Sequence, residues 1–154
     1  MTVEAANKGN PVLRKPLNWQ LIILLSMIGI MMGFATVYWI PSGIELVIWF
    51  VLFDFCAYII IKRSSGRYFL HGFLVGIFYS AWVTVIQIAF LTRYLASHPE
   101  EAAIMSTMPI SDSPRLLMLL TGIVVGATTG FILGIFALLA SKFVKKPSDM
   151  IRIF

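Results

Sequence analysis

An acidic side chain interrupts one of the most apolar stretches of this sequence. The run LVIWFVLFDFCAYIII, from Leu46 to Ile61, contains a single charged residue, Asp54. A charge near the centre of a bilayer costs about 2.5–3.5 kcal/mol, so a carboxylate in such a run needs a bonding partner or a function. We consider two roles for it. One is structural, as a helix-pairing bond or a neutral, protonated acid, and the other is a place in a proton or cation relay.

Three other polar residues have positions that bring them near the depth of Asp54 in the expected helices. Tyr58 lies one helical turn further along the same face, while Ser26 and His71 belong to neighbouring apolar segments. We therefore predict an intramembrane polar cluster of Asp54, His71, Tyr58 and Ser26, open to the cytoplasmic side. The tyrosine hydroxyl would donate a hydrogen bond to the carboxylate, which fits both the structural role and the relay.

Other motifs that carry chemistry are missing from the sequence. No GxxxxGK[ST], GxGxxG or HExxH pattern occurs, so nucleotide binding and zinc-protease chemistry have no motif support. His98 precedes Glu100 and Glu101, a loose group that we interpret as solvated loop rather than as a metal site. The single cysteine, Cys56, lies in an apolar run and is interpreted as a small core residue. We therefore expect no enzyme activity, no cofactor and no bound metal.

Glycines recur at a spacing of four along three apolar segments. They are Gly29 and Gly33, then Gly72 and Gly76, then Gly122, Gly126, Gly130 and Gly134. Residues four apart lie on one helix face, and small faces let helices pack closely where lipid provides no hydrophobic drive. We expect helix packing at all eight positions, either within one chain or against another copy or another membrane protein.

The composition indicates a membrane protein. Of 154 residues, 59% are hydrophobic and 12% are charged, whereas soluble domains have about 25% charged residues. A membrane span needs about 20 apolar residues. Four segments qualify: 19–40, 44–61, 68–91 and 116–141. We therefore predict an all-α membrane protein, built as a bundle of four transmembrane helices.

The basic residues gather on one side of the predicted bundle. Ten Lys and Arg residues fall in the N-terminal tail 1–18, in the loop between the second and third spans, and in the tail 142–154, against two on the opposite side. Because positive charge marks cytoplasmic loops, we expect both termini in the cytoplasm and the loop 92–115 outside. Within that loop, Pro99 followed by two acids predicts the start of a short amphipathic helix. We assign the net charge of +5 to topology and to contact with anionic lipid, and not to nucleic acid.

Two stretches carry a resemblance to a known family. They are YFLHGFLVGIFYSAWVTVIQIAFLTRYLASHPEEAAIM and, after a proline-bearing loop, LLMLLTGIVVGATTGFILGIFALLASKFVKK. Over about residues 17–146, this layout resembles a bacterial inner-membrane family known as domain of unknown function 4199, which is common in Bacteroidetes. Its members have four spans, a glycine-bearing third span and a basic C-terminal end. The resemblance implies the fold and the bacterial cytoplasmic (inner) membrane, and it supplies no activity or functional residue.

Two functions follow from these features. We expect a small polytopic inner-membrane protein of non-enzymatic role, packing through its glycine faces as a homo-oligomer or as an accessory subunit of a membrane complex. The alternative is a small oligomeric transporter or channel, coupled to ions or protons, with Asp54 and His71 in its path.

Overall fold

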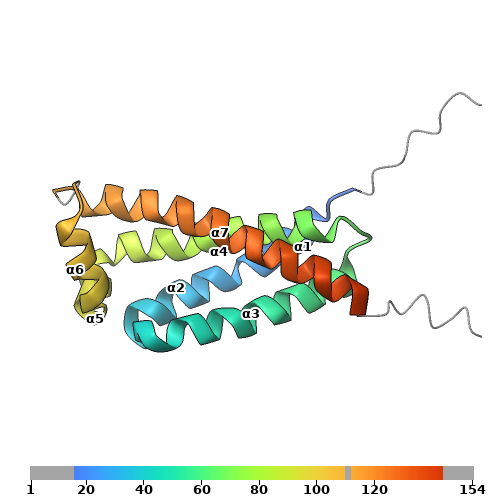
Figure 1. The fold of residues 1–154 in the computed structure, drawn as a ribbon, viewed down its shortest axis with the longest axis horizontal. Helices are drawn as coiled ribbons and strands as arrows, with labels where there is room; N and C mark the ends of the chain where they lie inside the picture. Colours follow the sequence, from blue (N-terminus) through green and yellow to red (C-terminus); the bar gives the residue numbers. More distant parts are fainter. Residues whose placement is uncertain (1–15, 110–111, 144–154) are drawn as a thin grey trace, which may run out of the picture.

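The computed structural model describes residues 16–109 and 112–143, and every regular element within them is an α-helix (Figure 1). The helices are α1 (Trp19–Ser26), α2 (Ile28–Tyr38), α3 (Ser42–Arg63), α4 (Tyr68–Ala89), α5 (Leu91–Ser97), α6 (Pro99–Thr107) and α7 (Pro114–Phe143). Four stretches are long and apolar enough to cross a membrane. The first consists of α1 and α2 together, and the other three are the single helices α3, α4 and α7. This confirms the predicted all-α fold with four such helices. Most of the predicted tails 1–18 and 142–154 lies outside the described residues.

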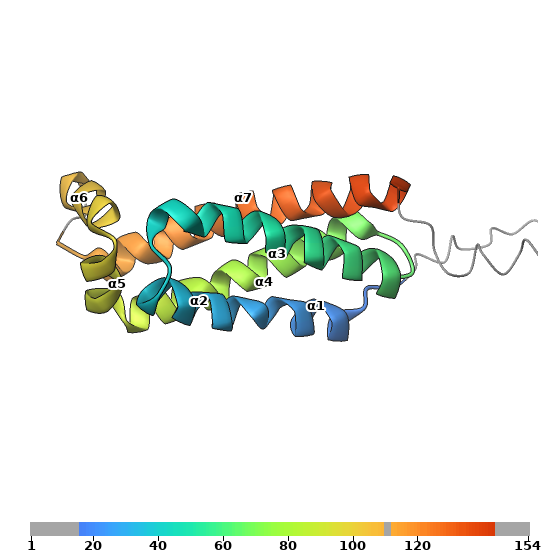
Figure 2. The same ribbon diagram turned by 90° about the horizontal axis from the view of Figure 1, so that it is seen from below.

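The first span has one irregular turn, at Met27. The Ser26 hydroxyl donates to the Ile23 carbonyl at 2.8 Å, and the Ile30 N–H donates to the Met27 carbonyl at 3.0 Å. The second bond spans three residues instead of four, which is the tighter 3₁₀ pattern. Figure 2 shows α1 and α2 following one another along the same side of the bundle, and together they are long and apolar enough to form one candidate membrane span.

Helix α4 is at the centre of the bundle. It lies alongside α7 in both views and also contacts α1, α2 and α3 (Figures 1 and 2). Apolar side chains from these helices meet in a shared core, where Ile22, Ile60, Val75 and Leu133 are each at most 1% exposed. The side of α4 that contacts α7 carries small residues at a spacing of four: Gly72, Gly76, Ser80 and Thr84.

All eight glycines predicted to pack helices lie at contacts between helices of this chain. Six lie between α4 and α7, and two between α2 and α4: Gly72, Gly76, Gly122, Gly126, Gly130 and Gly134, then Gly29 and Gly33. One of the closest backbone approaches is at Gly76, where an added Cβ would lie 2.5 Å from the Cα of Gly130. Real non-bonded carbon atoms prefer about 3.5–4.0 Å, so only glycine permits this contact. The glycine faces are therefore occupied within the chain.

The two ends of the bundle differ in structure. The start of α1, the end of α7 and the α3–α4 turn share one end, while α5 and α6 cover the other, here called the α5–α6 end (Figures 1 and 2). The α3–α4 turn contains Gly66 at φ 144° and Arg67 at φ 53°. The predicted loop 92–115 holds most of α5 and all of α6. Helix α6 begins at Pro99 with two acids in its first turn, as the sequence predicts.

Candidate functional site

The structure does not assemble the predicted cluster of Asp54, His71, Tyr58 and Ser26. Asp54 and Tyr58 lie on the outward face of α3, where Tyr58 is 52% exposed. Ser26 and His71 are buried between helices, at 1% and 0% exposed. Asp54 has no hydrogen bond or ion pair to any residue that the structure describes. Two of the four residues thus face outward and two face inward, so the structure does not bring them together, and the predicted cluster is corrected accordingly.

His71 ties the start of α1 to the start of α4. Its Nε2 accepts a hydrogen bond from the backbone N–H of Asn18 at 3.0 Å, and its Nδ1 donates to the Arg67 carbonyl at 3.0 Å. A ring nitrogen that accepts carries no proton, so these partners assign the neutral tautomer with its proton on Nδ1. The Asn18 side chain in turn caps α1 by accepting from the Leu21 N–H at 3.1 Å. Both nitrogens of His71 are therefore engaged in structural bonds.

A second group of polar side chains, which no sequence motif marks, lines a cavity toward the α5–α6 end. The cavity has a volume of about 150 Å³ and is enclosed by α3, α4, α5 and α7. Its polar lining consists of Glu45, Ser80, Thr84, Gln87, Tyr94 and Thr121. We call this cavity the polar chamber. Four helices have to pack correctly before these residues meet.

Glu45 is the carboxylate of the polar chamber. It lies in the first turn of α3, and its side chain is 16% exposed. Negative charge is favourable at the first turn of a helix, because the unpaired backbone N–H groups there carry partial positive charge. The indole N–H of Trp49, one turn further along α3, lies near this carboxylate without hydrogen-bond geometry. Trp49 Nε1 is thus a buried donor with no hydrogen-bond partner among the described residues.

His98 is buried beside Glu45, which corrects the interpretation of this residue as part of a solvated loop, while Glu100 is exposed. The His98 side chain is 0% exposed, and its ring stacks on Tyr94 with centroids 4.2 Å apart and planes 21° apart. His98 Nδ1 lies 3.1 Å from the Tyr94 carbonyl oxygen, and Nε2 lies 4.0 Å from a carboxylate oxygen of Glu45. The pairing joins the C-terminal end of α5 to the first turn of α3. His98 faces Glu45, and not the neighbouring acids of its own segment.

The remaining chamber residues are neutral hydrogen-bonding groups. Burial, together with the carboxylates of Glu45 and Glu101, raises the pKa of Tyr94, so its phenol stays protonated. The Gln87 side-chain amide donates to the Thr36 hydroxyl at 3.5 Å. This bond uses an N–H of Gln87 and leaves its carbonyl oxygen as an acceptor. The chamber therefore combines one carboxylate with an amide oxygen and several hydroxyls.

The chamber residues do not form a metal site. Across the described ranges 16–109 and 112–143, no three His, Cys, Asp or Glu side chains come together in a way that could hold a metal ion. Cys56 is 2% exposed and packs in the apolar core, as the sequence predicts. The arrangement is suited to ion pairing and hydrogen bonding with a ligand.

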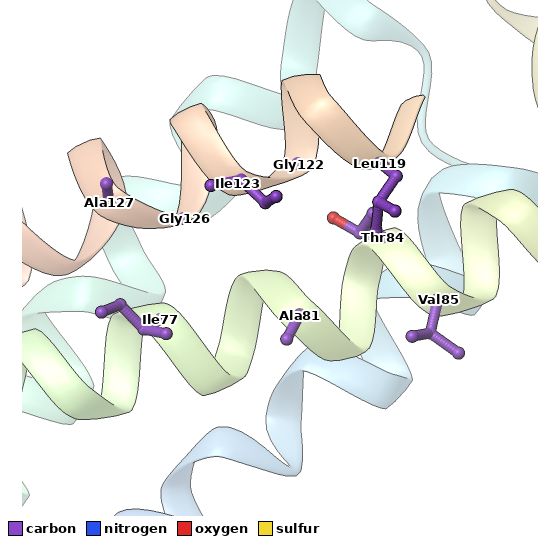
Figure 3. Close-up of a pocket in the computed structure, with 9 residues that line it drawn as sticks. All are labelled: Ile77, Ala81, Thr84, Val85, Leu119, Gly122, Ile123, Gly126 and Ala127. Atoms are coloured by element: carbon purple, nitrogen blue, oxygen red, sulfur yellow. The ribbon is translucent and has the colours of Figure 1, made fainter. Parts of the chain in front are cut away.

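An apolar groove adjoins the polar chamber between α4 and α7. Its volume is about 300 Å³, and it is lined by aliphatic side chains that include Ala81, Val85 and Ile123 (Figure 3). Thr84 and Gly122 line both the groove and the chamber. Figure 3 shows Thr84 reaching from α4 into the space between the two helices. This threonine therefore separates an apolar space on the surface of the bundle from the polar space inside it.

The sequence has no match among protein-family models, curated proteins or solved structures. The resemblance to domain of unknown function 4199 accordingly stays a prediction. Two features of the chain itself bear on function: the outward carboxylate of Asp54 and the polar chamber around Glu45.

Proposed function

We propose that this chain is an integral membrane protein of non-enzymatic role that works as a homo-oligomer joined through the outward face of α3. The observation that carries the proposal is the unpaired carboxylate of Asp54 on that face. At 1.5 Å per residue, Asp54 lies about 18 Å from the Ser42 end of α3 and about 14 Å from the Arg63 end. Ionisable side chains at such depth almost always face protein or water, and exposure to lipid would cost about 2.5–3.5 kcal/mol.

The outward face of α3 is complementary to itself. Tyr58 lies one turn beyond Asp54, and Lys62 follows one turn later with its Nζ 5.7 Å from the Tyr58 ring centroid. A carboxylate accepts hydrogen bonds and a phenol donates one. In a twofold dimer, residue i of one copy meets residue j of the other and the reverse also holds. Asp54 of each copy can then accept a hydrogen bond from Tyr58 of the other, because helical side chains lean toward the N-terminus and bring Tyr58 toward the level of Asp54.

The glycine faces already pack within the chain, and this favours the outward face of α3 as the surface that meets a second copy. The sequence predicts them as surfaces for association, either within the chain or with another copy. Most of these glycines are taken up by contacts between α4 and α7 and between α2 and α4, and the two that line the open groove, Gly122 and Gly126, still pack on Thr84 and Ser80 of the same chain. Helix α3 has the opposite character, because Val47, Val51 and Phe55 beside Asp54 are all more than 50% exposed. These apolar side chains would surround the polar pair in a dimer and keep lipid away from it.

We place the protein in the bacterial cytoplasmic (inner) membrane, with both termini in the cytoplasm. Lys62, Arg63 and Lys142 lie in the last turns of α3 and α7, at the end opposite α5 and α6. Positive charge at this end supports the cytoplasmic assignment and suits contact with anionic lipid headgroups. The acidic first turns of α3 and α6 lie at the other end.

The alternative function, an ion- or proton-coupled transporter using Asp54 and His71, has less support. The two residues face different environments, one outward and one in the core. His71 also bonds two backbone groups through its ring, and protonation of Nε2 would break the bond from Asn18. A relay through this pair would have to disrupt the start of α1.

The size of the assembly in a bilayer tests the proposal. We would reconstitute the full chain in lipid nanodiscs and measure its native mass, comparing wild type with Asp54→Leu and Tyr58→Phe. We expect a dimer for wild type and mainly monomer for Asp54→Leu, which removes the acceptor while leucine suits lipid. Tyr38→Phe is the matched control, because Tyr38 is also exposed, at 42%, but lies on α2. A persistent dimer in Asp54→Leu would contradict the proposal, as would a wild-type monomer bound to a different membrane protein.

A further inference from the structure

The polar chamber lies between two apolar spaces that open on the surface of the bundle. Thr84 and Gly122 are shared with the groove between α4 and α7. Trp49 and Val125 are shared with a second apolar groove of about 260 Å³ between α3 and α7. In a bilayer, such grooves are filled by hydrocarbon. A molecule that suits both environments has a polar head and an apolar arm.

The charge of the chamber decides which kind of head it accepts. Among the described residues, Glu45 is the charged side chain that lines it, and no Lys or Arg of residues 16–109 and 112–143 does so. The carbonyl oxygen of Gln87 and the hydroxyls of Ser80 and Thr84 add further acceptors. Trp49 and Tyr94 also line the chamber with their aromatic side chains. A carboxylate surrounded by acceptors and aromatic rings favours a positively charged donor.

His98 lies beside Glu45 and does not neutralise the Glu45 carboxylate when the imidazole ring of His98 is uncharged. His98 Nδ1 lies 3.1 Å from both the Tyr94 carbonyl oxygen and the Ser97 hydroxyl, and in the neutral tautomer that donates from Nδ1 the Nε2 carries no proton. That Nε2 is fully buried, has no hydrogen-bond partner in the described part of the chain and lies 4.0 Å from Glu45. In this tautomer the negative charge of Glu45 is available to a ligand inside the chamber.

We infer that the polar chamber binds the head of an amphiphilic primary amine, with the alkyl arm lying in the groove between α4 and α7. The ammonium group has three N–H donors and pairs with the Glu45 carboxylate, the Gln87 oxygen and a chamber hydroxyl. The volume of about 150 Å³ admits a small head, and the adjoining groove of about 300 Å³ admits a short alkyl chain past Thr84. This site is independent of the association of α3 with a second copy.

Binding of labelled n-hexylamine tests the inference. We would measure it on the full chain in nanodiscs of neutral lipid and subtract the uptake of empty nanodiscs. We expect saturable binding of one amine per chain, with hexanol and hexanoate failing to compete. Glu45→Gln should weaken binding at least about tenfold, because it removes a charge-assisted hydrogen bond. Glu100→Gln is the matched control, since it removes an exposed carboxylate of the same end and should leave binding unchanged.

A second variant tests the contribution of the groove to binding separately from that of the chamber. It also shows whether a loss of binding comes from a loss of fold. Ala81→Leu fills the groove from an exposed position that does not line the chamber. We expect it to weaken n-hexylamine binding and to leave methylamine binding as in wild type. Equal affinity of the Glu45→Gln and Glu100→Gln proteins for n-hexylamine would overturn the inference. So would the absence of saturable binding to a wild-type protein of correct size, or equal effects of Ala81→Leu on both amines.

Discussion

The contact between Gly76 and Gly130 makes a quantitative prediction for the stability of the bundle. In Gly76→Ala, the new Cβ would lie 2.5 Å from the Cα and 2.7 Å from the backbone N of Gly130. Carbon atoms prefer a separation of about 3.5–4.0 Å, so α4 and α7 would have to move apart by about 1 Å. Both obstructing atoms belong to the backbone of α7, so no side-chain rotation relieves the clash. Overpacking of this kind costs about 1–3 kcal/mol.

Two further glycines calibrate this effect. A Cβ at Gly43, in the first turn of α3, meets nothing within 4 Å. A Cβ at Gly126 meets the Cβ of Ser80 at 3.3 Å, a contact that a small shift relieves. Alanine also has a higher helix propensity than glycine, by about 1 kcal/mol. This difference stabilises the helix in all three variants, so it does not change their order. The free energy of unfolding should therefore fall in the order Gly43→Ala, Gly126→Ala, Gly76→Ala.

Unfolding of each variant in mixed detergent micelles, followed by circular dichroism, measures this order. We expect Gly76→Ala to be less stable than Gly43→Ala by about 1–3 kcal/mol, since the difference isolates the overpacking cost. Equal stability of Gly76→Ala and Gly43→Ala would refute the close approach of α4 and α7. A loss of dimer mass in Gly76→Ala at unchanged stability would instead place this glycine face against another copy.

Two further predictions concern single residues. His71→Ala should lower the free energy of unfolding by about 1–3 kcal/mol, because it removes both hydrogen bonds of the imidazole ring. Tyr58→Phe changes a residue on the outward face of α3 and should not lower the free energy of unfolding of the isolated chain in detergent. The raised pKa of Tyr94 predicts an alkaline loss of stability: the unfolded phenol ionises from its ordinary value of 10.0, while the folded one keeps its proton. The contribution of the Tyr94 phenol to stability is present below pH 10.0 and is lost as the pH rises further. The free energy of unfolding, measured from neutral to alkaline pH, should therefore decline less in Tyr94→Phe than in wild type.

The spans and the glycine contacts could be predicted from the sequence because they depend on local composition and spacing. Twenty or so apolar residues have to cross the bilayer as a helix, and glycines four apart have to share a face. The contact of Gly76 with Gly130 follows once α4 and α7 are neighbours. The start of α6 at Pro99 depends on local sequence in the same way.

The direction of Asp54 depends on which side of α3 packs inward. The buried side of α3 includes Phe53, Cys56, Ala57 and Ile60, which recur at helical spacing. Cys56 and Ala57 are small enough to mark a contact with another helix. Asp54 lies outside the face of α3 that these residues share. This spacing in the sequence indicates the inward side of α3, whereas the depth of Asp54 along the helix does not indicate the direction of its side chain.

The polar chamber could not be predicted, because its residues are distant in the chain. Glu45 and His98 meet only when α5 folds back over the start of α3. The sequence places His98 next to Pro99 and two acids, which is the usual composition of an exposed turn. Stacking on Tyr94 is a local contact between residues four apart, whereas burial at 0% exposure beside Glu45 arises from tertiary packing.

Cysteine cross-linking in native membranes tests the central claim, that α3 faces a second copy. In a Cys56→Ala background, Val51→Cys places one thiol on the outward face of α3, near Asp54 and Tyr58, and leaves both in place. Leu24→Cys is the control, at a position of α1 that is 66% exposed. A disulfide forms only between Cα atoms closer than about 7 Å, so mild oxidation should yield a covalent dimer for Val51→Cys and not for Leu24→Cys. Equal yields at the two positions, or no dimer at Val51→Cys, would contradict the account.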